Sequence, residues 1–207
     1  ACSDVTVCGG TPGRLFRISF SGELAYEVAV PARYGDALIR EIISAGEEFN
    51  ITPYGTEALG VMRIEKGHVT GAELNGQMTA FNINMNNMIS TKKDSIGSVL
   101  SRREVMVADD QVRLVGVKTI KKSDSLSSGA HFLAENDKPT TQNDQGWITS
   151  VCYSPHFEQH IGLGFLERGH ERHGEVLRAW DGIRGTDVLV EIVSSHMYDP
   201  EGGLQRG

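Results

Sequence analysis

The sequence predicts an α+β fold whose last part is a small antiparallel β-barrel or sandwich, and two observations support this. Between residues 14 and 66, two strand-like runs precede two stretches with the apolar spacing of helices, an order typical of α+β domains. After Ala108, short β-like runs recur at regular intervals, separated by Gly, Ser, Asp or Pro, which is typical of small barrels and sandwiches. We therefore expect a linker at 1–13 and two domains, at 14–107 and 108–207.

Turn-forming residues predict the first elements of the chain, up to residue 30. Residues 1–13 are small, polar and Gly-rich, which favours a linker. The runs Leu15–Phe20 and Tyr26–Val30 flank Ser21-Gly22-Glu23 and predict a hairpin.

Helices and later strands follow from apolar periodicity. Helices are expected at Tyr34–Phe49, at Gly55–Arg63 and at Asp94–Arg103, with Asp94 as an N-cap. The Asn-rich stretch 81–87 fits either a loop or an irregular helix. Six strands are expected: Val112–Ile120, His131–Ala134, Trp147–Val151, Ile161–Leu166, Val176–Trp180 and Val188–Val193.

Composition narrows the class of protein. With 27 acidic and 20 basic residues, the formal charge is −7. Phosphate backbones would repel such a chain, so nucleic acid is not an expected partner. No apolar run reaches the roughly 20 residues that span a bilayer, so no membrane partner is expected either. The cysteines Cys2, Cys8 and Cys152 form no CxxC motif, which favours a reducing cytoplasm.

Four segments together carry a resemblance to a known family. They are GELAYEVAVP at 22–31, PYGTEALGVMRIEKG at 53–67, TSVCYSP at 149–155 and YDPEG at 198–202. In order and spacing they resemble the aminomethyltransferase superfamily, which includes the glycine-cleavage T-protein and folate-using amine dehydrogenases. The second and fourth are most similar to alpha subunits of heterotetrameric sarcosine oxidases.

This resemblance implies a fold and a reaction. The fold would be the second half of a T-protein-like folate-binding domain, followed by the family's C-terminal barrel. Tetrahydrofolate would accept the one-carbon unit from oxidative demethylation of sarcosine to glycine; without folate, the products are formaldehyde and hydrogen peroxide. FAD, FMN and NAD would lie outside this chain, in a complex with beta, gamma and delta subunits.

The resemblance also implies site residues. Glu27 matches the family's pterin-binding glutamate, and one carboxylate can accept the adjacent N–H and amino groups of a pterin edge. Arg63 matches the family's arginine in Arg-Ile-Glu-Lys-Gly, where a planar fork suits a ligand carboxylate or ring-edge acceptors. The alternatives are a solvated Glu27 on an exposed strand face and an ion pair of Arg63 with Glu65 or Glu27. Tyr54 and Tyr198 are further folate contacts, with core packing as the alternative.

Other candidates point away from a metal or nucleotide site. His156 with His160, and His170 with His173, lack the three or four converging ligands of a metal centre, and surface histidines are expected. Cys152 lies in an apolar run and is expected to pack as a small hydrophobe. Gly9, Gly10 and Gly13 form no GxGxxG fingerprint.

Two departures from the family leave rival functions open. The family's catalytic aspartate belongs to the first half of its folate-binding domain, which this sequence does not contain, so the isolated chain is expected to be inactive. The Asn-rich run also differs from the stretch expected there. A T-protein-like transferase that uses a lipoyl carrier, and a non-catalytic interaction module, are the alternatives. Because the chain opens with Ala1, we expect processing or a start inside a longer protein.

Overall fold

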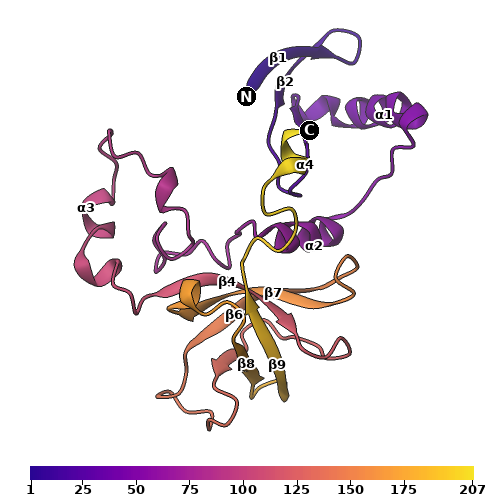
Figure 1. Cartoon of the computed structure of the whole chain (residues 1–207). Coiled ribbons are helices and arrows are strands. Elements are labelled where there is room, and N and C mark those ends of the chain that lie inside the picture. The colour runs from indigo at the N-terminus through magenta and orange to yellow at the C-terminus, as the bar shows by residue number, and fades with distance from the viewer. The chain divides into compact units, whose positions relative to one another are not determined.

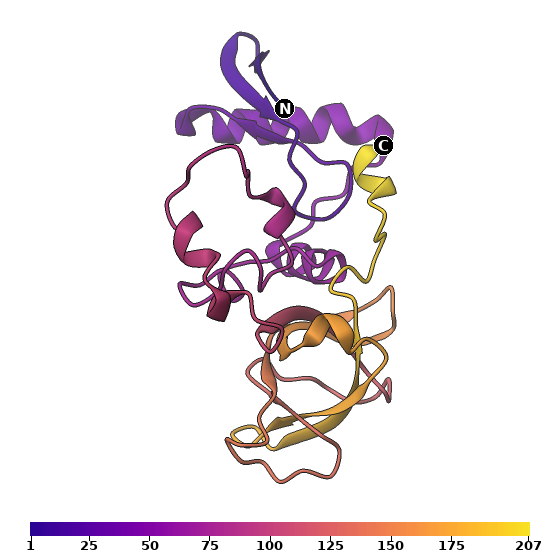
Figure 2. The same cartoon turned by 60° about the vertical axis from the view of Figure 1, so that its left-hand side comes forward.

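The computed structural model describes residues 1–207, which divide into two compact units. Unit 1 comprises residues 1–62 and 201–207, and unit 2 comprises residues 63–200. Figures 1 and 2 show their elements from two sides. No helix combines the length and the apolar character that crossing a membrane requires.

Unit 1 is built on a three-stranded antiparallel sheet in the order β1-β2-β3. These strands are β1 (Cys2–Val7), β2 (Thr11–Phe16) and β3 (Glu27–Ala29). Helix α1 (Gly35–Gly46) lies beside the β1–β2 hairpin (Figures 1 and 2). The short helix α4 (Gly203–Arg206) is held by Arg17, whose guanidinium donates to the carbonyls of Gln205 at 3.1 Å and Arg206 at 3.0 Å.

Residues 1–13 form β1 and the start of β2, so the predicted linker is wrong. The small and polar residues that suggested a linker make the tight turn at Cys8, Gly9 and Gly10, all of which have positive φ. Val5 and Val7 are half-buried on one face of β1, and this alternation was the missed strand signal. The predicted hairpin at 15–30 exists, but the paired strands are shorter and a loop at 17–26 replaces the expected turn.

Unit 2 is dominated by a closed antiparallel barrel with strand order β4-β7-β6-β5-β8-β9. All six predicted strands are confirmed, and a barrel rather than a sandwich is formed because β4 pairs with both β7 and β9. The strands are β4 (Val112–Thr119), β5 (His131–Leu133), β6 (Gly146–Ser154), β7 (Gln159–Glu167), β8 (Val176–Asp181) and β9 (Thr186–Val193).

Strand β7 is buried on both faces. Its outward side chains, including Ile161, Leu163 and Phe165, pack with Ile64 and Ile83 in a second apolar cluster outside the barrel core. Its inward positions include Gly164, where a Cβ would lie 3.1 Å from the Phe132 ring. Glycine at this position therefore leaves room for an aromatic core residue.

The Asn-rich stretch forms turns that attach to the barrel. The Asn82 side chain accepts from the Thr79 N–H and donates to the Val112 carbonyl, each at 2.8 Å. The Asn84 side chain donates to the Leu114 carbonyl at 2.8 Å. The stretch is therefore a loop whose amides bond to β4, followed by a 3₁₀ turn at Asn86–Met88.

The two predicted helices before residue 66 are confirmed, as α1 and as α2 (Thr56–Lys66). The third is shorter than predicted: α3 covers only Ser98–Ser101, and its N-cap is Gly97, without a side-chain cap. The expected Asp94 cap is therefore wrong. The domain boundary near residue 108 stays a prediction, since unit 2 already starts at Arg63 and includes residues that pack outside the barrel.

Candidate functional site

The end of α2 is shaped by a backbone motif. The His68 N–H donates to the Arg63 carbonyl at 2.8 Å, and the Gly67 N–H donates to the Ile64 carbonyl at 3.1 Å. Gly67 has φ +77°, so the three features form a Schellman motif. A Cβ on Gly67 would lie 2.3 Å from the Ser195 carbonyl oxygen, so glycine is needed here for both its conformation and its size.

The last turn of α2 carries three buried charged residues, Arg63, Glu65 and Lys66. Burial of an unpaired charge is costly, so each charge needs a partner. Arg63 pairs with Glu73, Glu65 accepts from the Ser154 hydroxyl, and Lys66 pairs with Asp199 at 2.8 Å. Lys66 also donates to the Asp199 carbonyl at 2.6 Å.

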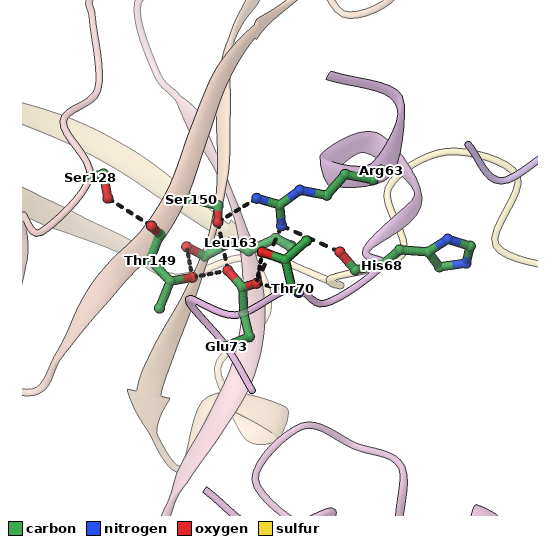
Figure 3. A network of polar contacts seen from close by, with 8 residues as sticks. All are labelled: Arg63, His68, Thr70, Glu73, Ser128, Thr149, Ser150 and Leu163. Atoms are coloured by element: carbon green, nitrogen blue, oxygen red, sulfur yellow. Dashed lines mark hydrogen bonds and ion pairs between the residues drawn. The ribbon is translucent and has the colours of Figure 1, made fainter. Parts of the chain in front are cut away.

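The Arg63 guanidinium lies in a buried polar network (Figure 3). Its Nη1 lies 3.3 Å from a Glu73 carboxylate oxygen and 3.3 Å from the His68 carbonyl. Its Nη2 donates to the Ser150 hydroxyl at 2.7 Å. Arg63 is only 9% exposed, and both terminal nitrogens have acceptors within the protein.

Glu73 is fully buried, at 0% exposure, and both carboxylate oxygens accept hydrogen bonds. One oxygen accepts from the hydroxyls of Thr149 at 2.5 Å and Ser150 at 2.6 Å. The other accepts from the Thr70 N–H at 2.8 Å, next to Arg63. Burial opposes ionisation, but the Ser150 and Thr149 hydroxyls, the Thr70 N–H and the Arg63 charge outweigh it and lower the pKa of Glu73.

The lowered pKa of Glu73 predicts an acid-sensitive unit 2. A carboxyl whose pKa falls on folding stabilises the native state fully above its unfolded pKa, near 4.3, and less as the pH drops through the folded value. Urea midpoints measured from pH 7 to pH 3 should therefore fall more steeply for the wild type than for Glu73→Gln. If the urea midpoints of the two proteins fell in parallel with pH, Glu73 would not contribute to the pH dependence of stability.

The structure places the four predicted folate residues in different environments. Glu27 is exposed on β3, and Tyr54 is 61% exposed between α1 and α2; both belong to unit 1. Arg63 and Tyr198 belong to unit 2, where the Tyr198 N–H donates to the Glu65 carbonyl at 2.9 Å. The Tyr198 ring is half-buried and meets the His156 ring edge-on, with centroids 4.7 Å apart.

Arg63 forms an ion pair, which was the alternative to a ligand contact, but its partner is not one of the two that were expected. The sequence suggested Glu65 or Glu27, but the partner is Glu73, and Glu65 accepts from Ser154 instead. Glu73, Ser150 and Thr149 were not singled out as interacting residues. These residues lie within or just after the segments that carry the family resemblance. That position marks them as candidates, but it does not show which side chains are in contact.

Two other residues considered from the sequence, Cys152 and His160, pack against neighbouring parts of the protein. Cys152 is half-buried on β6, and burial, aided by the nearby Glu65 charge and opposed by Arg63, raises the pKa of its thiol to about 12. His160 packs edge-on against Tyr153, and no group of three or more His, Cys, Asp or Glu residues is placed to hold a metal ion.

Two family models match this architecture. The GCVT N-terminal domain matches residues 1–93, and the glycine cleavage T-protein C-terminal barrel domain matches residues 113–199. A glycine cleavage system aminomethyltransferase T from Bartonella henselae has the same fold, with a TM-score of 0.76 at 17% identity over 91% of this chain and 50% of that one. The predicted T-protein-like fold is therefore confirmed.

Sequence relatives match nearly the whole chain. Sarcosine oxidase subunit alpha from Rhizobium meliloti (strain 1021) is 42% identical over 97% of this chain and 21% of its own length. A Corynebacterium sp. (strain U-96) protein of the same name is 37% identical over 100% of this chain and 22% of its own length. An aminomethyltransferase from Saccharopolyspora erythraea is 26% identical over 89% of this chain and 48% of its own length.

The chain thus spans about a fifth of the length of the sarcosine oxidase subunits and about half that of the aminomethyltransferase. The two family models cover both the N-terminal region and the barrel. Residues 1–93 thus match the GCVT N-terminal domain family, and residues 113–199 match the glycine cleavage T-protein C-terminal barrel family.

Proposed function

We propose that this chain supplies part of the tetrahydrofolate site of a sarcosine oxidase alpha subunit. The observation that carries the proposal is the 42% identity to such a subunit over 97% of the chain. Tetrahydrofolate would accept the one-carbon unit released when sarcosine is oxidised to glycine. FAD, FMN and NAD would be held elsewhere in a cytoplasmic complex with beta, gamma and delta subunits, so the isolated chain would not turn over sarcosine.

Glu27 suits a pterin contact. Its side chain is exposed and makes no hydrogen bond or ion pair in the structure. An unpaired carboxylate can accept two N–H donors from one edge of a ligand, and charge-assisted pairs of this kind are the strong ones. Tyr54, whose ring is also exposed, would add a stacking face, and Tyr198 is retained as a proposed ring contact.

Arg63 would act within unit 2, by positioning. Its terminal nitrogens already donate to Glu73, Ser150 and the His68 carbonyl. The guanidinium thereby fixes the last turn of α2 against the barrel strand β6, and with it the neighbouring segment that contains Tyr198.

Titration of 5-formyltetrahydrofolate tests the assignment of Glu27. We expect saturable binding in calorimetry with the natural protein that carries this sequence, and a loss of about tenfold to a hundredfold in Glu27→Gln, because hydrogen bonds to charged groups contribute about 1.5–3 kcal/mol. Glu23→Gln is the matched control, since Glu23 is also exposed and lies four residues earlier. Equal losses in both variants would contradict a specific contact at Glu27.

A T-protein-like transferase is the second candidate, favoured by the relatives named aminomethyltransferase. Transfer of the methylene carbon of an aminomethyl-lipoyl carrier protein to tetrahydrofolate, with release of ammonia and the dihydrolipoyl carrier and without flavin, would identify it. Absence of binding to reduced folate would instead favour a non-catalytic interaction module.

A further inference from the structure

A small pocket lies on the barrel, between β5 and the loop that joins β5 to β6. Its volume is about 230 Å³, below the roughly 300–1,000 Å³ of sites for drug-sized ligands. Leu133 and Pro139 are apolar parts of its lining, and His131, Asp144 and Trp180 carry its chemistry. All five residues lie in unit 2, and none takes part in the polar network of Figure 3. The pocket is therefore a separate candidate site for a small ligand.

The strand register brings His131 and Trp180 together. They are directly opposite each other on β5 and β8, so their side chains share one face of the sheet, with Cβ atoms about 4.5–5.5 Å apart. Phe132, the next residue along β5, packs in the barrel core, so the shared face is the outer one. A Cβ on Gly182 would lie 2.5 Å from the Trp180 ring. Glycine at this position therefore lets the indole lie against the backbone of the turn between β8 and β9.

A hydrogen bond to Asp144 fixes the tautomer of His131. The Nδ1 of His131 lies 2.8 Å from one carboxylate oxygen, and the other oxygen accepts from the Gly146 N–H at 3.1 Å. A carboxylate only accepts hydrogen bonds, so the neutral imidazole carries its proton on Nδ1 and keeps a lone pair on Nε2. The side chains of His131 and Asp144 are 47% and 32% exposed. The pair thus presents one negative charge and one accessible acceptor nitrogen.

The rest of the lining favours a cation. The hydroxyls of Thr140 and Thr141 make no hydrogen bond within the structure and are able to accept one. Lysine and arginine are absent from the lining, so no side chain of the pocket carries a fixed positive charge. The face of an indole attracts cations, and tryptophan is the best side chain for this interaction. The lining therefore suits a ligand that is positively charged and donates hydrogen bonds.

We propose that this pocket binds a small alkylammonium ion. The ion lies against the Trp180 indole, and its N–H groups donate to Nε2 of His131 and to Asp144, whose carboxylate oxygens each have a second lone pair. The ligand is small, because 230 Å³ equals the volume of about eight water molecules at about 30 Å³ each. Amino acids are disfavoured, since their carboxylate would be repelled by Asp144. The inference does not depend on the proposed function, because no proposed folate contact lines the pocket.

Four ligands of similar size separate charge, hydrogen bonding and shape. Isopropylammonium is the probe. Propan-2-ol has its shape without the charge, alanine has a carboxylate in place of one methyl group, and tetramethylammonium has the charge without N–H donors. Ligand-observed saturation-transfer NMR in phosphate buffer at constant ionic strength measures their binding to the natural protein that carries this sequence. The signal that is lost in pocket variants, rather than the total signal, reports on this pocket.

For that signal, we expect isopropylammonium to bind with a Kd in the millimolar range, as suits a ligand with so few atoms. Tetramethylammonium should bind about tenfold more weakly, because it loses the hydrogen bonds to the charged acceptor. Propan-2-ol and alanine should give no signal that depends on the pocket.

Two substitutions should weaken the binding of isopropylammonium. Asp144→Asn removes the charge but keeps an acceptor for the Gly146 N–H, so we expect a loss of about tenfold. Trp180→Leu should lose about fivefold and Trp180→Phe less, which is the order of cation–π strength. Glu135→Gln is the matched control: it removes an exposed carboxylate from the same loop, outside the lining, and should leave the affinity unchanged.

The outcomes are distinct from those for the proposed function. Urea midpoints first establish that each variant is folded. If folded Asp144→Asn and Trp180→Leu bind isopropylammonium as the wild type does, the pocket is not an ammonium site. An equal loss in Glu135→Gln would indicate a general effect of charge and would also overturn the proposal, as would a propan-2-ol signal that disappears in the same variants. None of these measurements involves folate, so the assignment of Glu27 stands or falls separately.

Discussion

Glu73→Leu is expected to lower the free energy of unfolding of unit 2 by about 3–5 kcal/mol, the usual cost of removing one partner of a buried ion pair. The Arg63 guanidinium would remain in a site where it is only 9% exposed, without its counter-charge. The Ser150 and Thr149 hydroxyls would also lose their carboxylate acceptor. Urea denaturation followed by tryptophan fluorescence measures the change, since both tryptophans, Trp147 and Trp180, are in the barrel.

The double variant Arg63→Met/Glu73→Leu tests the cause. With both charges removed, only hydroxyl and backbone partners are left unpaired, so the double variant should be more stable than Glu73→Leu alone. Glu171→Leu is the surface control: its ion pair with Arg168 is exposed, and its loss should leave the urea midpoint nearly unchanged. Additive losses in the double variant would contradict charge coupling between Arg63 and Glu73.

Gly67→Ala is expected to cost about 2–4 kcal/mol, the second largest effect. The residue has φ +77°, which a side chain tolerates poorly, and the added Cβ would lie 2.3 Å from the Ser195 carbonyl oxygen. That oxygen belongs to the backbone, so relief requires a shift of the chain. The Schellman motif that ends α2 would be disturbed with it, and Arg63 would be displaced from Glu73.

Gly60→Ala is the matched control for this substitution. Gly60 lies inside the same helix, and no atom lies within 4 Å of a Cβ built there. Alanine has a higher helix propensity than glycine, so this variant should be stabilised by up to about 1 kcal/mol. Thermal unfolding of both variants gives the comparison, and equal destabilisation would show that the helix, rather than the Gly67 position, is sensitive.

The barrel could be predicted from local patterns. Its strands are short apolar runs between turn residues, and the predicted runs coincide with β4 to β9 within a few residues. Such strands bury apolar side chains whichever strand each one pairs with, so period and turn chemistry suffice to find them. The first strand was missed because its small polar residues resemble a linker, although Val5 and Val7 alternate.

The candidate site was only partly predictable. The segments that resemble the T-protein family were identified, but the contacts between them were not. In the structure, three of these segments meet at the last turn of α2: Arg63 donates to Ser150, Glu65 accepts from Ser154, and Lys66 pairs with Asp199. Each contact joins residues more than 80 positions apart, a separation at which periodicity and spacing carry no information.

Local sequence therefore determined the six barrel strands and the helices α1 and α2, because these depend on short-range periodicity, and its recognisable segments identified the T-protein-like fold. Tertiary structure alone decided that Arg63 is the buried partner of Glu73, while Glu27 keeps an exposed and unpaired carboxylate. The physical reason is burial: a charge excluded from water must find its partner wherever the packed chain provides one.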